Sequence, residues 1–269
     1  MEVEWRRMRA DELREAARRD AMVILPVASL EQHGPHLPVE TDTTIGKAVA
    51  IGTARRLAEM GERAVVLPAL WTGLSEHHMP FGGTITLGLP AFAAVVEDVC
   101  RSVARHGFRR IVLSNSHGGN ENALRTLTDE LTVKLRVPVI QFTYAHAARP
   151  EIAALLTTQD GVRHACEAET AMMLALRPEL VARARTPPRD APSPAESGLY
   201  RWRSFAVRTE TGVRGNPDAG NAEQGERLIA AITEALAGKL ADPALWRAAF
   251  LPDAPASATP AEAKGRSHV

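Results

Sequence analysis

Four side chains that commonly bind divalent metals follow directly after an apolar segment of the chain. Residues 25–43 read LPVASLEQHGPHLPVETDT and contain Glu31, His33, His36 and Asp42 within twelve positions. Carboxylate oxygen and imidazole nitrogen together suit zinc, manganese or iron(II). Taken singly, each residue is more typical of a polar surface loop, with Asp42 as a helix cap. Glu31 and His33, two apart in extended chain, point the same way, so the group predicts a metal site.

A second polar cluster, SNSHGGN at residues 114–120, places His117 just after another apolar segment. The glycines that follow, Gly118 and Gly119, allow a ligand to approach the main chain closely. We therefore take His117 as a candidate metal ligand and the two glycines as candidate substrate contacts. A tight turn with a solvated histidine explains this segment about equally well.

The third cluster is RHACEAET at residues 163–170, at the start of an expected helix. His164 and Glu167 are three residues apart and could share a helix face, and Glu169 lies in the same first turns. Such a segment could supply both a further metal ligand and a proton donor for a leaving nitrogen. The alternative is an acid-rich first turn that is favoured by the helix dipole.

Alternating strands and helices are expected to position these clusters. Apolar runs predict strands at residues 22–27, 64–67, 110–113 and 137–142, and helical spacing predicts helices at 43–60, 91–106, 121–135, 166–176 and 222–240. This order indicates an α/β fold with a mostly parallel sheet and helices on both faces. Because ligands bind beyond the carboxyl ends of parallel strands, the loops after the first and third strands should meet there.

Composition excludes several other classes of protein. The 32 basic and 32 acidic residues cancel, so neither nucleic acid nor an anionic membrane is an expected partner. No apolar run approaches the length of a membrane span, and the N-terminus lacks the pattern of a secretory signal. The two cysteines, Cys100 in an apolar helix and Cys166 as a buried thiol, fit a reducing compartment, so a cytoplasmic location is expected.

Residues 1–250 are predicted to form a single catalytic domain, and residues 251–269 a disordered tail. The tail contains Pro, Ala, Ser and scattered charge, a composition that does not support a packed core. A Pro-rich loop is expected at residues 185–197.

The motifs together resemble the creatininase, or creatinine amidohydrolase, family. The resemblance rests on EQHGPHLPVETD at 31–42, SNSHGGN at 114–120 and HACEAET at 164–170, with weaker support from residues 73–87 and 211–225. It covers residues 5–240 in the order of the family. It implies a three-layer αβα sandwich, a homohexamer, and two divalent metal ions per subunit.

The resemblance also implies a role for each matching residue. One ion would be held by three ligands, Glu31, Asp42 and His117. The second ion would be held by His33 together with a bridging Asp42. His164 is similar to the family's proton-shuttling histidine, and Glu169 matches its acidic partner.

The chain departs from creatininase itself at important positions. Gly118 and Gly119 stand where creatininase has a tyrosine and a glutamate that ligates the second metal. Glu169 is the expected replacement ligand, Glu121 is the second choice, and a mononuclear site stays open. Asp160 stands where creatininase has a tryptophan, so we expect a family member other than creatininase itself.

The predicted function is that of a metal-dependent amidohydrolase, which cleaves a non-peptide C–N bond in a small open-chain or cyclic amide with a metal-activated water. His164 would protonate the leaving nitrogen. Ser75 and His78 are either substrate contacts or loop-packing residues. Within the family, the alternatives are a formamide deformylase and a peptidase that acts on a small modified peptide; outside hydrolysis, the alternative is a keto-sugar enzyme on the same scaffold.

Overall fold

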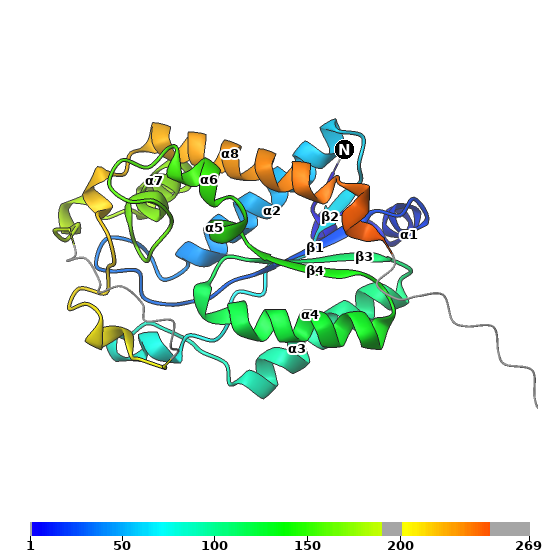
Figure 1. The fold of residues 1–269 in the computed structure, drawn as a ribbon, viewed down its shortest axis with the longest axis horizontal. Helices are drawn as coiled ribbons and strands as arrows, with labels where there is room; N and C mark the ends of the chain where they lie inside the picture. The colour runs from blue at the N-terminus through cyan, green and yellow to red at the C-terminus, as the bar shows by residue number, and fades with distance from the viewer. Residues whose placement is uncertain (1, 190–200, 248–269) are drawn as a thin grey trace, which may run out of the picture.

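A four-stranded parallel sheet lies at the centre of the protein (Figure 1). The computed structural model describes residues 2–189 and 201–247. The strands are β1 (Met22–Val27), β2 (Ala64–Val66), β3 (Arg110–Asn115) and β4 (Val139–Thr143). They pair in the order β2-β1-β3-β4, and every described pairing between them is parallel. The predicted parallel sheet is therefore confirmed.

Helices cover both faces of this sheet. The longer ones are α1 (Ala10–Arg18), α2 (Thr41–Glu59), α3 (Leu89–Arg105), α4 (Glu121–Leu135), α7 (Glu167–Leu176) and α8 (Ala222–Leu240), and the short ones are α5 (Tyr144–Ala147) and α6 (Arg149–Ala153). In Figure 1, α2 and α8 lie on one face, and α3 and α4 lie on the other. This confirms the predicted three-layer αβα arrangement.

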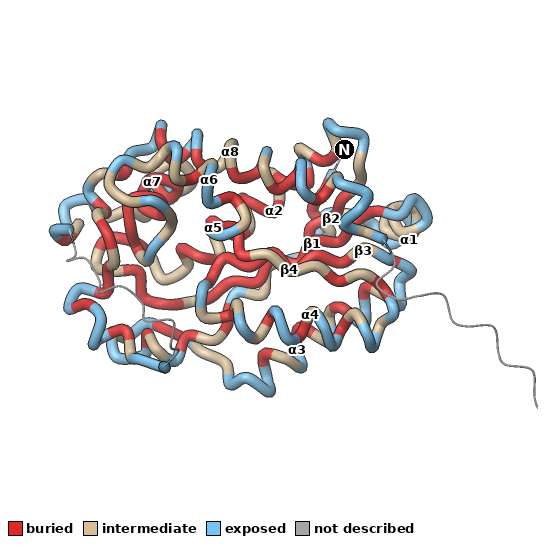
Figure 2. The backbone as a smooth tube through the Cα atoms, viewed as in Figure 1, coloured by how far each residue is buried: buried red, intermediate tan, exposed pale blue. Residues whose placement is uncertain are grey.

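The apolar sequence of β1 explains its central position. Its six residues are all buried (Figure 2), as expected for a strand covered on both faces. Because side chains alternate along a strand, Val23 and Leu25 pack with Phe92 of α3, whereas Ile24 packs with Ala50 of α2. Full burial of each large apolar side chain stabilises the fold by roughly 1.5–3 kcal/mol.

Several predicted boundaries were displaced by one or two residues. Helix α2 begins at Thr41, and its N-cap residue is Glu40, which makes no side-chain capping hydrogen bond. The alternative interpretation of Asp42 as the cap of this helix is therefore wrong. Strand β3 continues to Asn115, beyond the predicted Leu113. Its polar end stays buried because the Asn115 amide donates to the Thr143 hydroxyl at 3.0 Å.

The loops after β1 and β3 diverge to opposite faces of the sheet. Strand β1 leads into α2 on one face, whereas β3, which pairs with it, leads into α4 on the other (Figure 1). In open α/β sheets this reversal of strand order creates a crevice at the carboxyl ends of the two strands. Helix α2 approaches the loop after β3 closely, since a Cβ on Gly46 would lie 2.5 Å from Ser116 Oγ.

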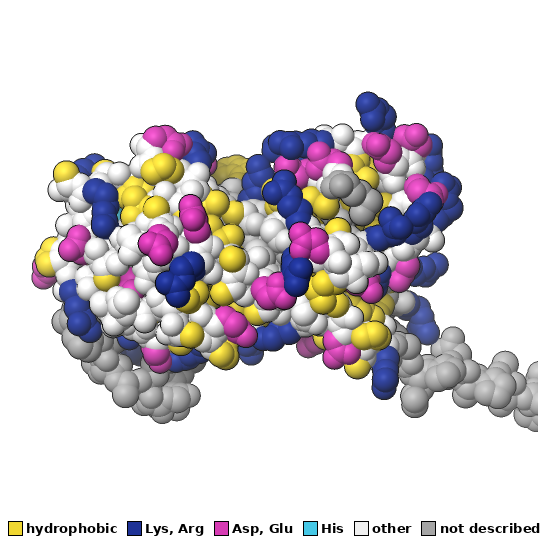
Figure 3. Space-filling model, turned by 90° about the horizontal axis from the view of Figure 1, so that it is seen from above, with side chains coloured by type: hydrophobic (Ala, Val, Ile, Leu, Met, Phe, Trp, Pro, Cys, Tyr) yellow, Lys and Arg dark blue, Asp and Glu magenta, His cyan; other side chains and the backbone are white. Residues whose placement is uncertain are grey.

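The face seen in Figure 3 carries Lys and Arg side chains that gather toward the end bearing α1 and are mixed with Asp and Glu. None of the described helices has the length and apolar character needed to cross a membrane. The predicted tail at 251–269, and most of the predicted Pro-rich loop, lie outside the described residues. A single domain over residues 1–250 stays a prediction.

Candidate metal centre

The loop after β1 folds back on itself and turns two predicted ligands inward. The Glu31 N–H donates to the Val39 carbonyl at 3.0 Å, and His33 forms an antiparallel bridge with Leu37. Gly34, at the turn between them, has φ +65°, a conformation that favours glycine. Glu31 and His33 are each only 1% exposed as a result.

Glu31, Asp42 and His117 converge from three separate segments of the chain. His117 Nδ1 lies 3.1 Å from Glu31 Oε2 and 3.3 Å from Asp42 Oδ2. Ser116 reinforces this meeting, because its hydroxyl donates to the Asp42 main-chain carbonyl at 2.9 Å. The other ring nitrogen, His117 Nε2, donates to the Leu74 carbonyl at 3.2 Å. In neutral His117, Nδ1 therefore presents its lone pair to two carboxylates.

Asp42 also contacts His33, which forms a second group of possible ligands with His164 and Glu169. Its Oδ1 atom lies 3.4 Å from His33 Nε2, which in turn lies 3.8 Å from Glu169 Oε2. The His33 Nδ1–H donates to the Glu31 carbonyl at 3.1 Å, so Nε2 is the nitrogen left to face the carboxylates. Glu169 accepts a hydrogen bond from the Ala165 N–H. Ala165 has φ +51°, and this turn connects His164 to α7.

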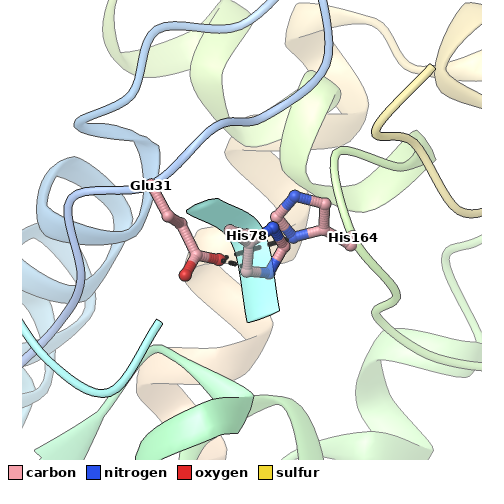
Figure 4. Close-up of side chains that lie close together, drawn as sticks. All are labelled: Glu31, His78 and His164. Atoms are coloured by element: carbon pink, nitrogen blue, oxygen red, sulfur yellow. Dashed lines mark ion pairs between the residues drawn. The ribbon is translucent and has the colours of Figure 1, made fainter. Parts of the chain in front are cut away.

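Glu31, His78 and His164 form a third group, shown in Figure 4. Glu31 Oε1 lies 3.4 Å from His78 Nε2 and 3.6 Å from His164 Nδ1. His78 comes from the 3-10 helix Glu76–Phe81, and His164 from the loop before α7. Both side chains point toward the Glu31 carboxylate from the side opposite to its own loop.

Three buried polar atoms of this centre lack a hydrogen bond partner among the described residues: Glu31 Oε1, His33 Nε2 and Asp42 Oδ2. Buried carboxylate oxygens and imidazole lone pairs that face one another are unfavourable unless a cation lies between them. These donor atoms also match the ligand types of zinc, manganese and iron. The residues present therefore fit one or two divalent ions.

The pKa values of the histidines in the centre also indicate that positive charge is favoured there. Burial by itself lowers the pKa of His33, but the carboxylates of Asp42 and Glu169 raise it to about 10. Burial likewise opposes protonation of His117, yet Glu31 and Asp42 raise its pKa well above the ordinary value. Without a metal, protons occupy the positions where a cation is favoured.

Neighbouring groups shift in the opposite sense. Burial lowers the pKa of His78 to about 3 and holds the pKa of His164 well below its usual range. Both imidazoles are therefore neutral near pH 7. Burial raises the pKa of Glu169, although the charge of His33 opposes this effect. A neutral His164 beside a polarised substrate has the protonation state of a general base.

Ser75 lies beneath the first ligand group. Its hydroxyl donates to Glu31 Oε2 at 2.6 Å and lies 3.1 Å from His117 Nε2. The side chain is fully buried, so its contacts are those of a residue that positions the ligands. Asn120 joins the surrounding loops, because its amide donates to the Ala28 carbonyl at 3.0 Å and accepts from the Leu74 N–H at 2.9 Å.

The two glycines after His117 differ in their surroundings. A Cβ on Gly119 would lie 2.3 Å from His117 Nε2 and 2.4 Å from the Leu74 carbonyl oxygen, whereas a Cβ on Gly118 would meet nothing within 4 Å. Gly119 therefore permits His117 to pack against the loop after β2. A glutamate at this position, as in creatininase, does not fit this packing.

Other sequence candidates are directed elsewhere. Glu167 accepts hydrogen bonds from the main-chain N–H groups of Thr157 and Thr158 at 2.7 and 2.9 Å. The expectation that Glu167 and His164 share a helix face is therefore wrong. The turn at Ala165 separates the two, so helical spacing does not apply. Glu121 pairs with Arg125 and His146, not with the centre.

His36 and both cysteines also lie outside the ligand groups. His36 Nε2 lies 2.9 Å from the Thr170 hydroxyl, and burial lowers the pKa of His36 to about 4. Cys100 and Cys166 are buried free thiols, as predicted. Burial raises the pKa of Cys166 to about 11, which argues against a nucleophilic thiolate.

Three residues at the centre were missed by sequence reasoning. The Gln32 amide lies between His78 and His164, 2.8 and 3.0 Å from a ring nitrogen of each. The ring of Phe205 lies 4.4 Å from His78 and 4.7 Å from His164, between centroids. His77 stacks near His117 at 5.6 Å. Only Gln32 and His77 had a signal, their position inside the polar motifs.

The position at which the resemblance to creatininase expects a tryptophan lies on the surface. Asp160 is exposed and forms an ion pair with Arg149 at 2.7 Å. A cavity of about 490 Å³ lies near α1 and β2, lined by residues such as Glu12, Arg19 and Arg63, and none of the candidate ligands lines it. The chemistry of the donor atoms, not cavity size, identifies this centre.

The family model described as creatininase, creatinine amidohydrolase, matches residues 6–240. The mycofactocin precursor peptide peptidase of Mycobacterium tuberculosis (strain CDC 1551 / Oshkosh) is 35% identical over 218 residues, which are 79% of this chain and 81% of that protein. The creatinine amidohydrolase of Pseudomonas putida is 31% identical over 179 residues, which are 60% of this chain and 66% of that one.

A solved structure described as "Creatininase Mn" superimposes with a TM-score of 0.75 at 26% identity. The superposition covers 89% of this chain and 98% of that chain. The resemblance inferred from the motifs and the predicted fold are both confirmed.

Proposed function

Because the chain belongs to the creatininase family, we propose that it is a metal-dependent amidohydrolase that splits a C–N bond in a small amide. The protein is a hydrolase of this family, and the two relatives described above carry the names of a peptidase and an amidohydrolase. One observation carries the metal dependence: three buried polar atoms, on Glu31, His33 and Asp42, converge without a hydrogen bond partner among the described residues.

The ligand groups support two metal positions that share Asp42. Glu31 Oε2, Asp42 Oδ2 and His117 Nδ1 would hold the first ion, and His33 Nε2, Asp42 Oδ1 and Glu169 Oε2 the second. Glu169 then takes the place of the glutamate that creatininase has at Gly119. Zinc, manganese and iron(II) all suit these donors. Such ions supply an acidified water and polarise the substrate carbonyl.

The side chains around the ions perform the proton transfer. An amide nitrogen leaves poorly unless it gains a proton as the tetrahedral intermediate collapses. His164 is neutral at pH 7, is directed at Glu31 and is slightly exposed, with 13% of its side chain accessible. It would take a proton from the attacking water and return it to the leaving nitrogen. Phe205, packed on His164, would form the apolar wall of the substrate site.

Three variants test this proposal against metal content and turnover. Asp42→Asn should remove most of the bound metal, since both ligand groups use this carboxylate. His164→Gln should retain metal but lose turnover. His146→Gln, an exposed histidine paired with Glu121, is the matched control and should retain both. A purified wild-type protein that binds no added zinc or manganese, or unchanged turnover in His164→Gln, would overturn the proposal.

A peptide substrate is the second candidate, because the relative with the greater identity and coverage is a precursor peptide peptidase. Release of amine, ammonia or formate from cyclic ureides, lactams, formamides and short peptides separates the candidates.

We also propose, from the family resemblance, a cytoplasmic homohexamer. Sedimentation of the purified protein tests that assembly.

A further inference from the structure

The side-chain amide of Gln32 has a single orientation. Its Oε1 atom accepts a hydrogen bond from the Gly34 N–H at 2.9 Å, and its Nε2 atom donates to the Gly212 carbonyl at 3.2 Å. A main-chain N–H only donates and a carbonyl only accepts, so an amide turned by 180° would lose both bonds. The nitrogen of Gln32 therefore faces the histidines.

This orientation determines which nitrogen of His78 carries the proton. Gln32 Nε2 lies 2.8 Å from His78 Nδ1. Because the amide nitrogen is a donor, Nδ1 must accept and has no proton of its own. The proton of His78 is then on Nε2, which lies 3.4 Å from Glu31 Oε1 (Figure 4). His78 therefore presents an N–H group to the carboxylate.

The main chain of the same residue determines the proton of His164. His164 Nε2 lies 2.8 Å from the Gln32 carbonyl oxygen, which can only accept. The proton of His164 is therefore on Nε2, although the Gln32 amide also lies 3.0 Å away. His164 Nδ1 keeps a lone pair, and it lies 3.6 Å from the same Glu31 oxygen, Oε1.

We infer that Gln32 is a positioning residue that gives two adjacent histidines opposite roles: His78 turns an N–H group toward Glu31, and His164 keeps a bare Nδ1 for proton transfer. The catalytic part of this inference rests on the proposed hydrolytic function. When water attacks, the O–C bond forms and the water proton moves to His164 Nδ1. When the C–N bond breaks, that proton passes to the leaving nitrogen, and His164 returns to its starting form.

The same geometry decides whether the third ligand group, Glu31, His78 and His164, can bind a metal. A metal bound by Glu31, His78 and His164 needs a lone pair on His78 Nε2. His78 would then carry its proton on Nδ1, directed at the donor nitrogen of Gln32 at 2.8 Å. Unlike the His164 proton, which the Gln32 carbonyl accepts, that proton would meet no acceptor among the described residues, so this third group is not a metal position.

Long-range ¹H–¹⁵N NMR of the zinc-loaded protein, labelled in histidine, tests the inference. We assign the two side chains by the signals lost in His78→Gln and His164→Gln. Both histidines should show a protonated Nε2 and an unprotonated Nδ1. A His78 protonated on Nδ1 in the wild-type protein overturns the inference, whatever the variants do.

Gln32→Met removes the side-chain donor but keeps the main-chain carbonyl. It should therefore release His78 from its single tautomer while the His164 pattern stays unchanged, and kcat should fall about 10- to 100-fold with little change in KM. Gln32→Glu should move a proton onto His78 Nδ1. Gln141→Glu, whose amide contacts the Thr143 hydroxyl, is the control and should alter neither histidine. A His78 pattern that survives Gln32→Met overturns the inference.

Metal content and hydrolysis are measured on the same samples. Absence of both with the expected tautomers would refute the proposed function and leave the role of Gln32 in place. A wild-type protein that binds metal and turns over substrate, but carries the His78 proton on Nδ1, would refute only the role of Gln32.

Discussion

Replacing Gly119 with alanine should displace His117 and disrupt the metal centre. The added Cβ would lie 2.3 Å from His117 Nε2, 2.4 Å from the Leu74 carbonyl oxygen and 2.9 Å from His77 Cε1. The Leu74 carbonyl belongs to the main chain and cannot rotate away. His117 must then move, and it loses the hydrogen bond that leaves its Nδ1 lone pair facing Glu31 and Asp42.

The expected size follows from overpacking in a rigid site. Inserting a methyl group into a filled space destabilises a fold by about 1–3 kcal/mol. Loss of the contact that orients a metal-binding histidine lowers metal affinity by about 10- to 100-fold. Gly118→Ala is the matched control, since its Cβ meets nothing within 4 Å. A glycine-to-alanine change without a clash stabilises a protein by about 0.4–1 kcal/mol.

Urea unfolding and zinc titration of the two variants decide the matter. We expect Gly119→Ala to unfold at a lower urea concentration than wild type and to bind zinc more weakly, whereas Gly118→Ala retains both properties. Equal stability and equal zinc affinity in the two variants would refute the close packing described for Gly119. A glutamate at 119 should likewise fail to add a metal ligand.

Three further outcomes are expected. Zinc affinity should rise from pH 6.5 to pH 10, because the raised pKa of His33 means that metal must displace a proton. In the metal-free protein, the stabilisation from this proton is complete below about pH 6.5 and is lost as the pH approaches 10. Urea unfolding over this pH range can follow the loss. Phe205→Ala should raise KM more than it lowers kcat, because it removes the apolar ring over His78 and His164, and steady-state kinetics measure this split. Glu167→Gln should lower the free energy of unfolding by about 1–3 kcal/mol without changing metal content, because its carboxylate accepts bonds from two main-chain N–H groups.

Much of the centre could be predicted because its residues are close along the chain or follow neighbouring strands. Glu31 and His33 lie in the short loop after a buried strand, and Asp42 lies in the first turn of the helix that follows, so chain connectivity alone keeps them together. His117 follows a strand that pairs with β1, and parallel strands present their carboxyl ends on one edge. Helix boundaries were less predictable: α2 begins two residues before its expected start, so Asp42 lies inside the helix and faces two histidines.

The resemblance selected Glu169 over Glu167, but only the tertiary structure gives the physical reason. Residues two positions apart on a helix differ by about 200° in direction, so only one of Glu167 and Glu169 can face the centre. The sequence offers both carboxylates in the first turn of α7. The way in which α7 packs directs Glu169 toward His33 and Glu167 toward Thr157.

The sequence by itself determined the types of ligand, the α/β fold and the edge of the sheet at which the ligands meet. Residue chemistry and the alternation of strands and helices along the chain can be read from local segments. Only the tertiary structure decided how the ligands are grouped and which nitrogen of each histidine is free. Gln32, for example, contacts the Gly212 carbonyl, 180 residues further along the chain. Contacts of this range leave no periodic signal, since they depend on how α7, α8 and the loops pack around the sheet.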